Sequence, residues 1–335
     1  MCSGALNAPE HVATRFKMQI GHVQLELLGS ATTVRQVTGL WERLFVLESE
    51  ELATSKLRFE LVPRPLLEVA GKAVYSARAL SVRKTATGFF LRCGDSSLRV
   101  DLGANTAHCY LAEDFEEQSV YEKREFFLLA LMMLVRPHGL YGLHGNGLLK
   151  DDLDVLIVGQ SGSGKTTTTL NLIRSGWQYL SDDALLLREA KNTVEALAFR
   201  KGFSCTPETL QYFGELPSTF EFGDPEGKRV LDMDETFGGG FTRACTPNVL
   251  LFPKLTNTKV TRLQPLASVQ ALILLSQQSA GIMTDTAVSQ QQLHVLQRLV
   301  QQTQSYHLLL GSDALEGPYT VATLLANLHT LAGTR

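Results

Sequence analysis

The chain has 335 residues, of which 44% are hydrophobic, and its formal net charge at pH 7 is -3. This length allows two domains with well-filled cores, while the weakly acidic balance argues against a protein that binds nucleic acid irrespective of sequence, because such proteins carry a basic excess. The longest apolar stretch, residues 126–135, is too short to span a bilayer. The first residues lack the apolar region of a signal peptide, and the five cysteines show no Cys-x-x-Cys spacing. We therefore expect a reduced, cytoplasmic protein without a membrane span.

The first third of the sequence predicts a β-rich module with one helix. Residues 16–28 and 57–62 have the composition of strands, and residues 31–51 place apolar side chains at helical intervals. Short β-prone runs separated by turn signals follow at residues 79–82, 89–93, 98–102 and 107–111. We expect an antiparallel sheet. The predicted boundary lies near residue 118, so that residues 1–118 form a smaller α+β domain, for which substrate docking is one hypothesis, and residues 119–335 form a second domain of the α/β class.

The second domain is predicted to begin with a helix over residues 121–135, which Pro137 ends. Its most informative segment is Gly-Gln-Ser-Gly-Ser-Gly-Lys-Thr at residues 159–166, between a predicted strand at residues 155–158 and a predicted helix at residues 166–173. In this pattern, backbone N–H groups form a concavity for phosphate and the start of the helix adds a positive dipole end. The sequence therefore predicts a binding site for a nucleoside triphosphate. The residues expected to contact the nucleotide are Gly159, Gln160, Ser161, Gly162, Ser163, Gly164, Lys165, Thr166 and Thr167.

Two acidic residues follow the predicted nucleotide loop after one helix and one strand. Gly176 is a natural end for the helix, and residues 177–180 have the composition of a strand. If this strand is the parallel neighbour of the strand at residues 155–158, the carboxyl ends of both lie at one edge of the sheet, and Asp182 and Asp183 face the phosphates. Paired carboxylates there hold Mg²⁺ or take a proton from an attacking hydroxyl. The alternative is that Ser-Asp-Asp only forms a turn.

These segments resemble the HPr serine kinase/phosphorylases and their relatives. The resemblance rests on Leu-His-Gly at residues 143–145, the nucleotide loop with its strand at residues 155–166, Arg-Ser-Gly-Trp at residues 174–177 and Leu-Ser-Asp-Asp at residues 180–183. It covers about residues 120–330. It implies a short P-loop fold shared with phosphoenolpyruvate carboxykinase, ATP as phosphate donor, Mg²⁺ as metal and a hydroxyl-bearing acceptor.

The resemblance also implies roles for single residues. Lys165 binds the β- and γ-phosphates, and Thr166 and Asp183 hold Mg²⁺. Asp182 is the candidate general base toward the acceptor hydroxyl, and His144 stands near the γ-phosphate or the metal. Two further cations, Arg200 and Lys228, are candidates for neutralising charge on the transferring group, with a solvated surface position as the alternative.

The sequence departs from the family pattern in one segment. The Glu-x-Arg-Gly core that marks true HPr kinase/phosphorylases has no clear copy, and the region offers Arg-Lys-Gly at residues 200–202 and Glu-Thr-Phe-Gly-Gly-Gly at residues 235–240 instead. The phosphorylase reaction and HPr as substrate are therefore not implied. The glycines at residues 238–240 suit either a lid over the acceptor or a flexible loop.

Other readings of the nucleotide loop require motifs that the sequence lacks. A transporter ATPase needs a Leu-Ser-Gly-Gly-Gln signature, and a GTPase needs Asn-Lys-x-Asp. An amino-terminal nucleophile at Cys2 is disfavoured because Ser3, rather than glycine, follows it. We predict a kinase that transfers the γ-phosphate of Mg-ATP to a hydroxyl of a protein, a peptide or a small molecule. The alternative is a nucleotide-binding sensor or scaffold without phosphate transfer. The family resemblance makes a homo-oligomer one possible assembly, but the sequence does not give the oligomeric state.

Overall fold

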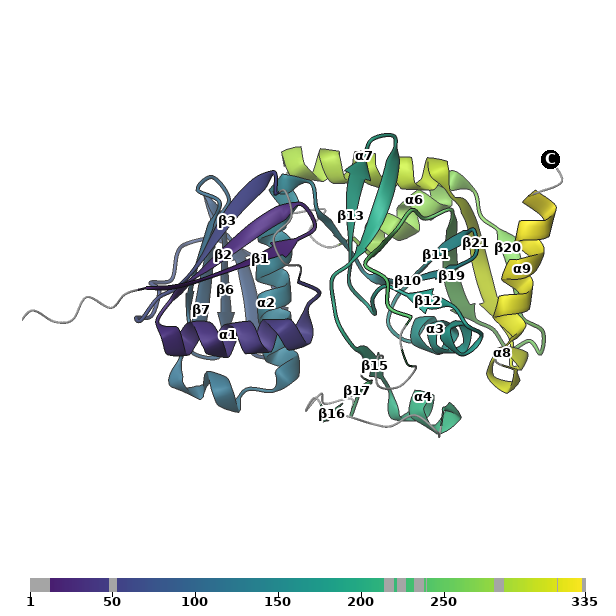
Figure 1. The fold of residues 1–335 in the computed structure, drawn as a ribbon, viewed down its shortest axis with the longest axis horizontal. Helices are drawn as coiled ribbons and strands as arrows, with labels where there is room; N and C mark the ends of the chain where they lie inside the picture. The colour runs from purple at the N-terminus through teal and green to yellow at the C-terminus, as the bar shows by residue number, and fades with distance from the viewer. Residues whose placement is uncertain are drawn as a thin grey trace, which may run out of the picture. The chain divides into compact units, whose positions relative to one another are not determined.

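The computed structural model describes residues 13–47, 53–213, 220–221, 227–231, 238, 240–279, 286–317 and 319–332. The chain divides into two compact units, Met1–Arg43 with Leu47–Glu116, and Leu44–Val46 with Glu117–Arg335. Both units combine helices and strands, so the protein is of the mixed α/β class (Figure 1). The predicted docking role of the first domain stays a prediction. No helix in the described part of the chain is long and apolar enough to cross a membrane.

The first unit is built on a sheet of eight strands in the order β1-β2-β3-β8-β7-β6-β5-β4. The strands are β1 (Thr14–Ile20), β2 (Val23–Gly29), β3 (Ser55–Leu61), β4 (Lys72–Ala77), β5 (Leu80–Lys84), β6 (Gly88–Cys93), β7 (Ser96–Asp101) and β8 (Thr106–Tyr110). Helix α1 (Ala31–Leu44) lies between β2 and β3 in the sequence, and the short 3-10 helix η1 (Glu113–Glu117) follows β8. Residues 16–28, expected as one strand-like run, form the hairpin of β1 and β2 around Gly21, whose φ is +55°.

The expectation of an antiparallel sheet is wrong for two strand pairs of the first unit. β2 pairs with β3 in parallel, and β3 pairs with β8 in parallel, whereas the other neighbouring strands are antiparallel. A parallel pair needs a crossover connection, and α1 provides it between β2 and β3. The helix is amphipathic, and its buried Val34, Val37 and Trp41 belong to the core, where the Trp41 ring meets Phe59 of β3 edge to face at 5.0 Å.

The second unit contains a sheet of six strands in the order β12-β10-β11-β19-β21-β20. The strands are β10 (Gly145–Lys150), β11 (Leu153–Val158), β12 (Gln178–Tyr179), β19 (Val249–Leu255), β20 (Arg262–Pro265) and β21 (Gln304–Leu310). β11, β19 and β21 are parallel neighbours, and β10 is antiparallel to β11 and to β12. The predicted strand at residues 177–180 is therefore β12, but it is not a neighbour of β11. Because β10 lies between them and opposes both, β11 and β12 still point in the same direction.

Two smaller sheets, seven α-helices and one 3-10 helix complete the described part of the second unit. One sheet has the order β18-β14-β13-β9 and the other β15-β17-β16. Their strands are β9 (Tyr141–Leu143), β13 (Leu185–Ala190), β14 (Thr193–Ala198), β15 (Phe203–Cys205), β16 (Phe220–Glu221), β17 (Arg229–Leu231) and β18 (Ala244–Cys245). The α-helices are α2 (Val120–Val135), α3 (Lys165–Arg174), α4 (Pro207–Tyr212), α6 (Ser268–Gln277), α7 (Thr286–Gln302), α8 (Asp313–Glu316) and α9 (Thr320–Ala332), with the 3-10 helix η2 (Arg136–His138) after α2.

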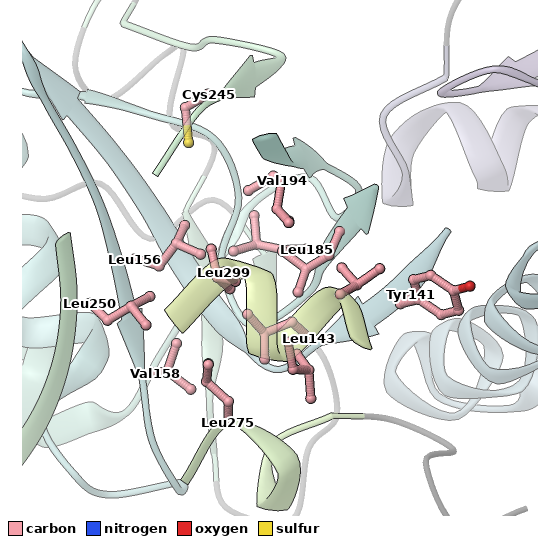
Figure 2. Close-up of a cluster of buried hydrophobic side chains, with 14 of the residues drawn as sticks. Tyr141, Leu143, Leu156, Val158, Leu185, Val194, Cys245, Leu250, Leu275 and Leu299 are labelled. Carbon is pink, nitrogen blue, oxygen red and sulfur yellow. The ribbon is translucent and has the colours of Figure 1, made fainter. Parts of the chain in front are cut away.

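The six-stranded sheet is covered on both faces, and β11 shows how the sequence achieves this. Successive side chains of a strand point to opposite faces, and all four residues from Val155 to Val158 are fully buried. Leu156 and Val158 belong to a core cluster with residues of α6, α7 and β13, of which Figure 2 shows the labelled members. Val155 and Ile157 belong to a second cluster with residues of α3 and α9. A continuous apolar run is thus the expected sequence for this central parallel strand.

Candidate functional site

The glycine-rich segment connects β11 to α3, so the strand and the helix expected on either side of it are both present. Gly162 and Gly164 have φ values of +78° and +98°, in the left-handed region that residues with a Cβ atom rarely adopt. A Cβ atom on Gly164 would also lie 2.6 Å from Cδ1 of Leu310. Glycine at these two positions is therefore a requirement of the backbone path.

The start of α3 presents unpaired backbone donors. Its N-cap is Gly164, which supplies no side-chain cap, and the N–H of Thr168 makes the helical hydrogen bond to the Gly164 carbonyl at 3.0 Å. The N–H groups before Thr168 belong to the first turn, where no intrahelical acceptor exists. In addition, Oγ of Ser163 is among the described buried side-chain atoms without a hydrogen-bond partner. This loop therefore offers several donors and one orphan hydroxyl to an anion.

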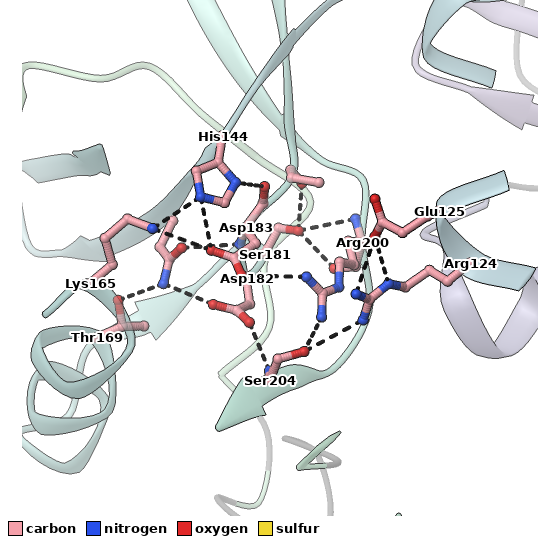
Figure 3. Close-up of polar contacts among 12 residues, drawn as sticks. Arg124, Glu125, His144, Lys165, Thr169, Ser181, Asp182, Asp183, Arg200 and Ser204 are labelled. Carbon is pink, nitrogen blue, oxygen red and sulfur yellow. Dashed lines mark hydrogen bonds and ion pairs between the residues drawn. The ribbon is translucent and has the colours of Figure 1, made fainter. Parts of the chain in front are cut away.

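Lys165 is the first residue of α3, and its side chain is only 5% exposed. Its Nζ donates to the carbonyl oxygens of Gly159 at 2.9 Å and of Gln160 at 3.2 Å, and lies 3.1 Å from Nε2 of His144. It also lies 3.6 Å from Oδ1 of Asp183 (Figure 3). The ammonium group thus joins the glycine-rich loop to the acidic residues that follow β12.

His144 lies between β9 and β10, and its contacts show which ring nitrogen carries the hydrogen. Its Nδ1 is 3.0 Å from the carbonyl oxygen of Asp183. A carbonyl oxygen only accepts, so Nδ1 carries the hydrogen, and Nε2 of the neutral ring is left to accept from Lys165. Burial, together with the charges of Lys165 and Arg200, lowers the pKa of His144 from its ordinary value despite the nearby carboxylate of Asp183.

The two acidic residues have different surroundings. Asp182 is fully buried, its Oδ1 accepts a hydrogen bond from Nδ2 of Asn146 at 3.1 Å, and its Oδ2 accepts one from the N–H of Ser204 at 2.8 Å. Burial and, second, the charge of Asp183 raise the pKa of Asp182 to about 7. A carboxyl group with such a pKa exchanges its proton near neutral pH.

Asp183 is the more accessible of the pair, with 26% of its side chain exposed and a left-handed backbone at φ +60°. Its carboxylate lies 3.6 Å from Lys165 Nζ, 3.6 Å from His144 Nε2 and 3.6 Å from an Arg200 guanidinium nitrogen (Figure 3). Burial alone would raise the pKa of Asp183, but Arg200, His144 and Lys165 hold it below its ordinary value. Asp183 is therefore the ionised member of the pair.

Arg200 brings a second cation to the acidic pair, and Arg124 of α2 lies beside it. The side chains of Arg200 and Arg124 are 4% and 6% exposed. Both donate to Oγ of Ser204, Arg124 at 3.5 Å, and Arg124 also pairs with Glu125 at 3.2 Å. Burial, followed by the charge of Arg200, lowers the pKa of Arg124 to about 10. Each arginine thus has a carboxylate beside it, Glu125 for Arg124 and Asp183 for Arg200.

The structure brings together five predicted site residues: Lys165, His144, Asp182, Asp183 and Arg200 (Figure 3). Thr166 and Thr167 lie in the first turn of α3. Lys228 immediately precedes β17, and its proposed role stays a prediction. Cys2 and part of the glycine run, Gly239 with residues 235–237, lie outside the described residues.

Sequence reasoning missed three residues that contact the acidic pair or its arginine. Asn146 is a polar residue within the buried strand β10, which was a signal, because a buried polar group requires a partner. Arg124 lies within the charged run of residues 122–125 at the start of α2, and neither it nor Ser204 carried such a signal in the sequence.

The described residues contain no cluster of three His, Cys, Asp or Glu side chains placed to hold a metal ion. A protein-only cage of that kind is also not what Mg²⁺ usually has, since this ion keeps several waters and binds through one or two carboxylates and substrate phosphates. Asp183 and the hydroxyl of Thr166 are of the chemical type that would serve in such a site. The residues present therefore fit a metal that arrives with a polyphosphate.

No family model matches the chain. A curated protein named HPr kinase/phosphorylase from Caldanaerobacter subterraneus subsp. tengcongensis is 25% identical over 211 residues, which are 62% of this chain and 55% of that protein. Another of the same name from Malacoplasma penetrans is 36% identical over 61 residues, which are 18% of this chain and 20% of that protein. The chain thus spans about half of the first relative and a fifth of the second.

One solved structure, of the Hpr(Ser) kinase/phosphatase from Coxiella burnetii, aligns with 58% of this chain and 93% of that chain. Its TM-score is 0.33 and its sequence identity is 15%.

Proposed function

Since the chain is related to the HPr kinase/phosphorylases, we propose that it is a kinase that transfers the γ-phosphate of Mg-ATP to a hydroxyl group. The acceptor is a serine of a protein or peptide, or a small molecule. We further propose that the second unit has the carboxykinase-like P-loop arrangement. A cytoplasmic location and assembly into homo-oligomers are part of the same proposal.

The nucleotide site in this proposal is the loop from Gly159 to Gly164 with the first turn of α3. Its support is the left-handed backbone at Gly162 and Gly164, the first turn of α3, whose N–H groups have no intrahelical acceptor, and the unpartnered hydroxyl of Ser163. Lys165 now donates to two carbonyls of the loop, and we propose that it turns from them to the phosphate oxygens. A charge-assisted hydrogen bond to phosphate is stronger than one to a neutral carbonyl.

The two acidic residues have different roles in this proposal, one toward the metal and one toward the acceptor hydroxyl. The bound Mg-ATP supplies the phosphoryl group and an ion that offsets its charge. Asp183 is partly exposed and ionised, which suits a contact with Mg²⁺ together with Thr166. Asp182, with a pKa of about 7, suits a group that takes the proton of the acceptor hydroxyl. Arg200, 3.6 Å from Asp183, would offset negative charge on the transferring group.

The observation that carries the proposal is the distance of 3.6 Å between Nζ of Lys165 and Oδ1 of Asp183. It places the cation at the start of α3 beside the acidic pair that follows β12, as phosphate transfer requires. The test measures binding of a nonhydrolysable ATP analogue with Mg²⁺ by calorimetry, and phosphate transfer from labelled ATP to serine-bearing peptides. Lys165→Ala is expected to lose both, and retention of both in this variant would exclude the site.

A matched control is Lys150→Ala. Lys150 donates to the carbonyl of Ser175 at 2.7 Å, so it contacts the opposite end of α3 from Lys165. Loss of this lysine removes a similar cation from the same unit without touching the glycine-rich loop. We expect its nucleotide binding to match the wild type.

One observation favours the alternative of a sensor or scaffold that binds nucleotide without transfer. Asp182 is fully buried, and each of its oxygens already accepts a hydrogen bond, which is also how a purely structural carboxyl group behaves. The comparison of wild type with Asp182→Asn separates the two functions. If both bind ATP equally and neither transfers phosphate, the sensor function holds.

A further inference from the structure

One face of the sheet in the first unit carries a groove of about 500 Å³. The groove crosses β1, β2 and β3, which Figure 1 labels, and reaches the start of β8. Successive side chains of a strand point to opposite faces, and in β3 the buried Phe59 meets Trp41 of α1. Arg58, which precedes Phe59, and Lys56 therefore lie on the face away from α1, and both are exposed.

Most of the charged side chains that line this groove are basic. Four cations and one carboxylate line it, namely Arg15, Lys17, Lys56 and Arg58 with Glu26. Glu26 pairs with Arg15 at 3.1 Å and with Arg58 at 3.9 Å, and it lies opposite Lys17 in the register of β1 and β2. One carboxylate cannot offset four cations, so the groove keeps an excess of positive charge on a chain whose formal net charge is -3.

The ion pairs around the groove leave Lys56 for a partner. Arg58 also lies 3.6 Å from Glu60, which in turn lies 3.2 Å from His108. Lys56 has no ion pair with a described carboxylate, and its neighbour in the register of β2 and β3 is the uncharged Gln24. An anion that enters the groove can therefore pair with Lys56 without breaking an existing ion pair of that residue.

We propose that this groove binds an acidic segment of a protein or peptide partner, whose carboxylates pair with Lys56, Arg58 and the cations of β1. Three strand spacings separate β1 from β8 in the sheet, which is about 14 Å. Four residues of an extended chain cover about 13 Å, so a segment of this length fits the groove. That the partner is the phosphate acceptor rests on the proposed function, whereas the binding of an acidic segment does not.

The residues of the groove favour a peptide over a nucleic acid. None of the described residues that line it is aromatic, whereas single-stranded nucleic acids are held by bases that stack on aromatic side chains as well as by charge. Glu26 lies in β2, between the cations of β1 and those of β3. This carboxylate opposes a backbone that has a negative charge at every unit, but a peptide can place its acidic side chains to either side of it.

The test is fluorescence anisotropy of the full chain with a labelled peptide that contains four consecutive glutamates, at an ionic strength of about 0.1 M. The matched peptide has glutamine at the same four positions. We expect the glutamate peptide to bind roughly tenfold more tightly, the sum of several exposed ion pairs, and to lose this advantage as salt is added. Equal affinities of the two peptides would overturn the proposal.

Lys56→Glu places a negative charge in the groove, and Lys72→Glu is its control. Both lysines are exposed strand residues of the first unit without an ion pair to a described carboxylate. Lys72 lies in β4, five strand spacings from β3 in the sheet, which is about 24 Å and more than twice the Debye length of about 10 Å. The two substitutions change the net charge of the chain equally.

We expect Lys56→Glu to weaken binding of the glutamate peptide roughly fivefold to tenfold, and Lys72→Glu to bind it as the wild type does. Equal losses in the two variants would assign the binding to net charge and overturn the proposal. A uridine oligonucleotide with the same number of charges provides a further comparison. If it bound the wild type more tightly than the glutamate peptide and lost affinity in Lys56→Glu, nucleic acid would be the occupant and the proposal would also fail.

A measurement on the wild type locates the peptide without any substitution. On addition of the glutamate peptide, the NMR signals of backbone amides in β1, β2 and β3 are expected to shift, and those of β4 to keep their positions. Shifts that spare β1, β2 and β3 would contradict the proposal.

The groove lies in the first unit and the proposed nucleotide site in the second, so the two can be tested separately. Lys165→Ala is expected to bind the glutamate peptide with wild-type affinity. If the wild type binds this peptide but transfers phosphate to no serine-bearing peptide, the proposed function fails and the acidic-segment site stands. If phosphate transfer occurs but the glutamate peptide binds no better than its glutamine counterpart, only the acidic-segment site fails.

Discussion

The ammonium group of Lys165 lies 3.1 Å from Nε2 of His144, a contact that is favourable only while the imidazole ring is neutral. A protonated ring would have a hydrogen on both nitrogens and would repel the lysine. The buried cation therefore keeps His144 in its neutral form, and the ring in turn holds the lysine near the acidic pair.

The first prediction concerns this pair. Lys165→Met removes the charge but keeps most of the side-chain length, so the pKa of His144 is expected to rise. Burial, the largest cause of the lowering, is unchanged in this variant, so the rise is limited to the part of the lowering that the lysine causes. NMR titration of the His144 ring protons measures the change. A pKa that falls or stays constant in Lys165→Met would contradict the contact.

The second prediction separates the roles of the acidic residues. Asp182→Asn is expected to keep ATP affinity within roughly tenfold and to slow transfer by about two to four orders of magnitude, the scale of general-base loss. Asp183→Asn is expected to weaken binding of Mg-ATP more than binding of ATP alone, because an ionised contact to the metal is lost. Binding calorimetry with and without Mg²⁺, and single-turnover transfer, provide the measurements. If Asp182→Asn instead weakened Mg-ATP binding and Asp183→Asn mainly slowed transfer, Asp183 would be the general base and Asp182 the metal ligand.

The third prediction is a pH dependence of stability. The pKa of Asp182 in the folded protein is about 7, against an ordinary value of 3.8. Between these two pH values the folded state therefore binds more protons than the unfolded state. The contribution of Asp182 to stability is thus fully present below pH 3.8 and is lost as the pH rises toward 7.

Asp182→Asn removes this dependence and leaves an offset that does not vary with pH, because one donor to the carboxyl group loses its acceptor. The stability of the variant relative to wild type is therefore expected to increase from pH 4 to about pH 7. Urea unfolding at several pH values tests the slope. A difference that is constant over this range would show that Asp182 is ionised throughout.

The fourth prediction concerns the backbone of the glycine-rich loop. Gly164→Ala is expected to destabilise the second unit by about 1–3 kcal/mol, because alanine is strained at φ +98° and its Cβ would meet Leu310. The matched control is Gly39→Ala in α1, where a Cβ would have nothing within 4 Å. This control is expected to stabilise the first unit by about 0.5–1 kcal/mol, since glycine is a poor residue within a helix.

Fluorescence can follow the two units separately, because the chain has two tryptophans, Trp41 in the first unit and Trp177 in the second. Unfolding is measured in backgrounds that keep one tryptophan and replace the other by phenylalanine. Equal effects of Gly164→Ala and Gly39→Ala would show that the left-handed backbone at Gly164 is not a constraint.

Several elements were predictable because their causes are local. The helix α3 begins beside a glycine that must have positive φ, and it ends before Gly176, whose φ is +83°. The buried strand β11 was evident from its continuous apolar run. The edge strand β4 was missed because all six of its residues are exposed, so burial imposed no alternating pattern on its sequence.

Which strands pair with each other could not be predicted from local sequence signals. The adjacency of β10 and β12, and the parallel pairing of β3 with β8, depend on which partner buries the most surface and completes the hydrogen bonds of the backbone. The expectation of an antiparallel first sheet holds for the hairpin-connected strands. It fails for β2 with β3, which α1 connects, and for β3 with β8.

The sequence by itself determined that a glycine-rich loop lies between a buried strand and a helix, because positive φ and residue periodicity are properties of neighbouring residues. Only the tertiary structure decided how the surroundings of the Asp182 and Asp183 carboxyl groups differ. Asn146 reaches Asp182 across 36 positions and Arg124 reaches Ser204 across 80. Burial and charge at such separations exist only once the strands and helices have packed, so the ionisation of the pair is a property of the folded unit.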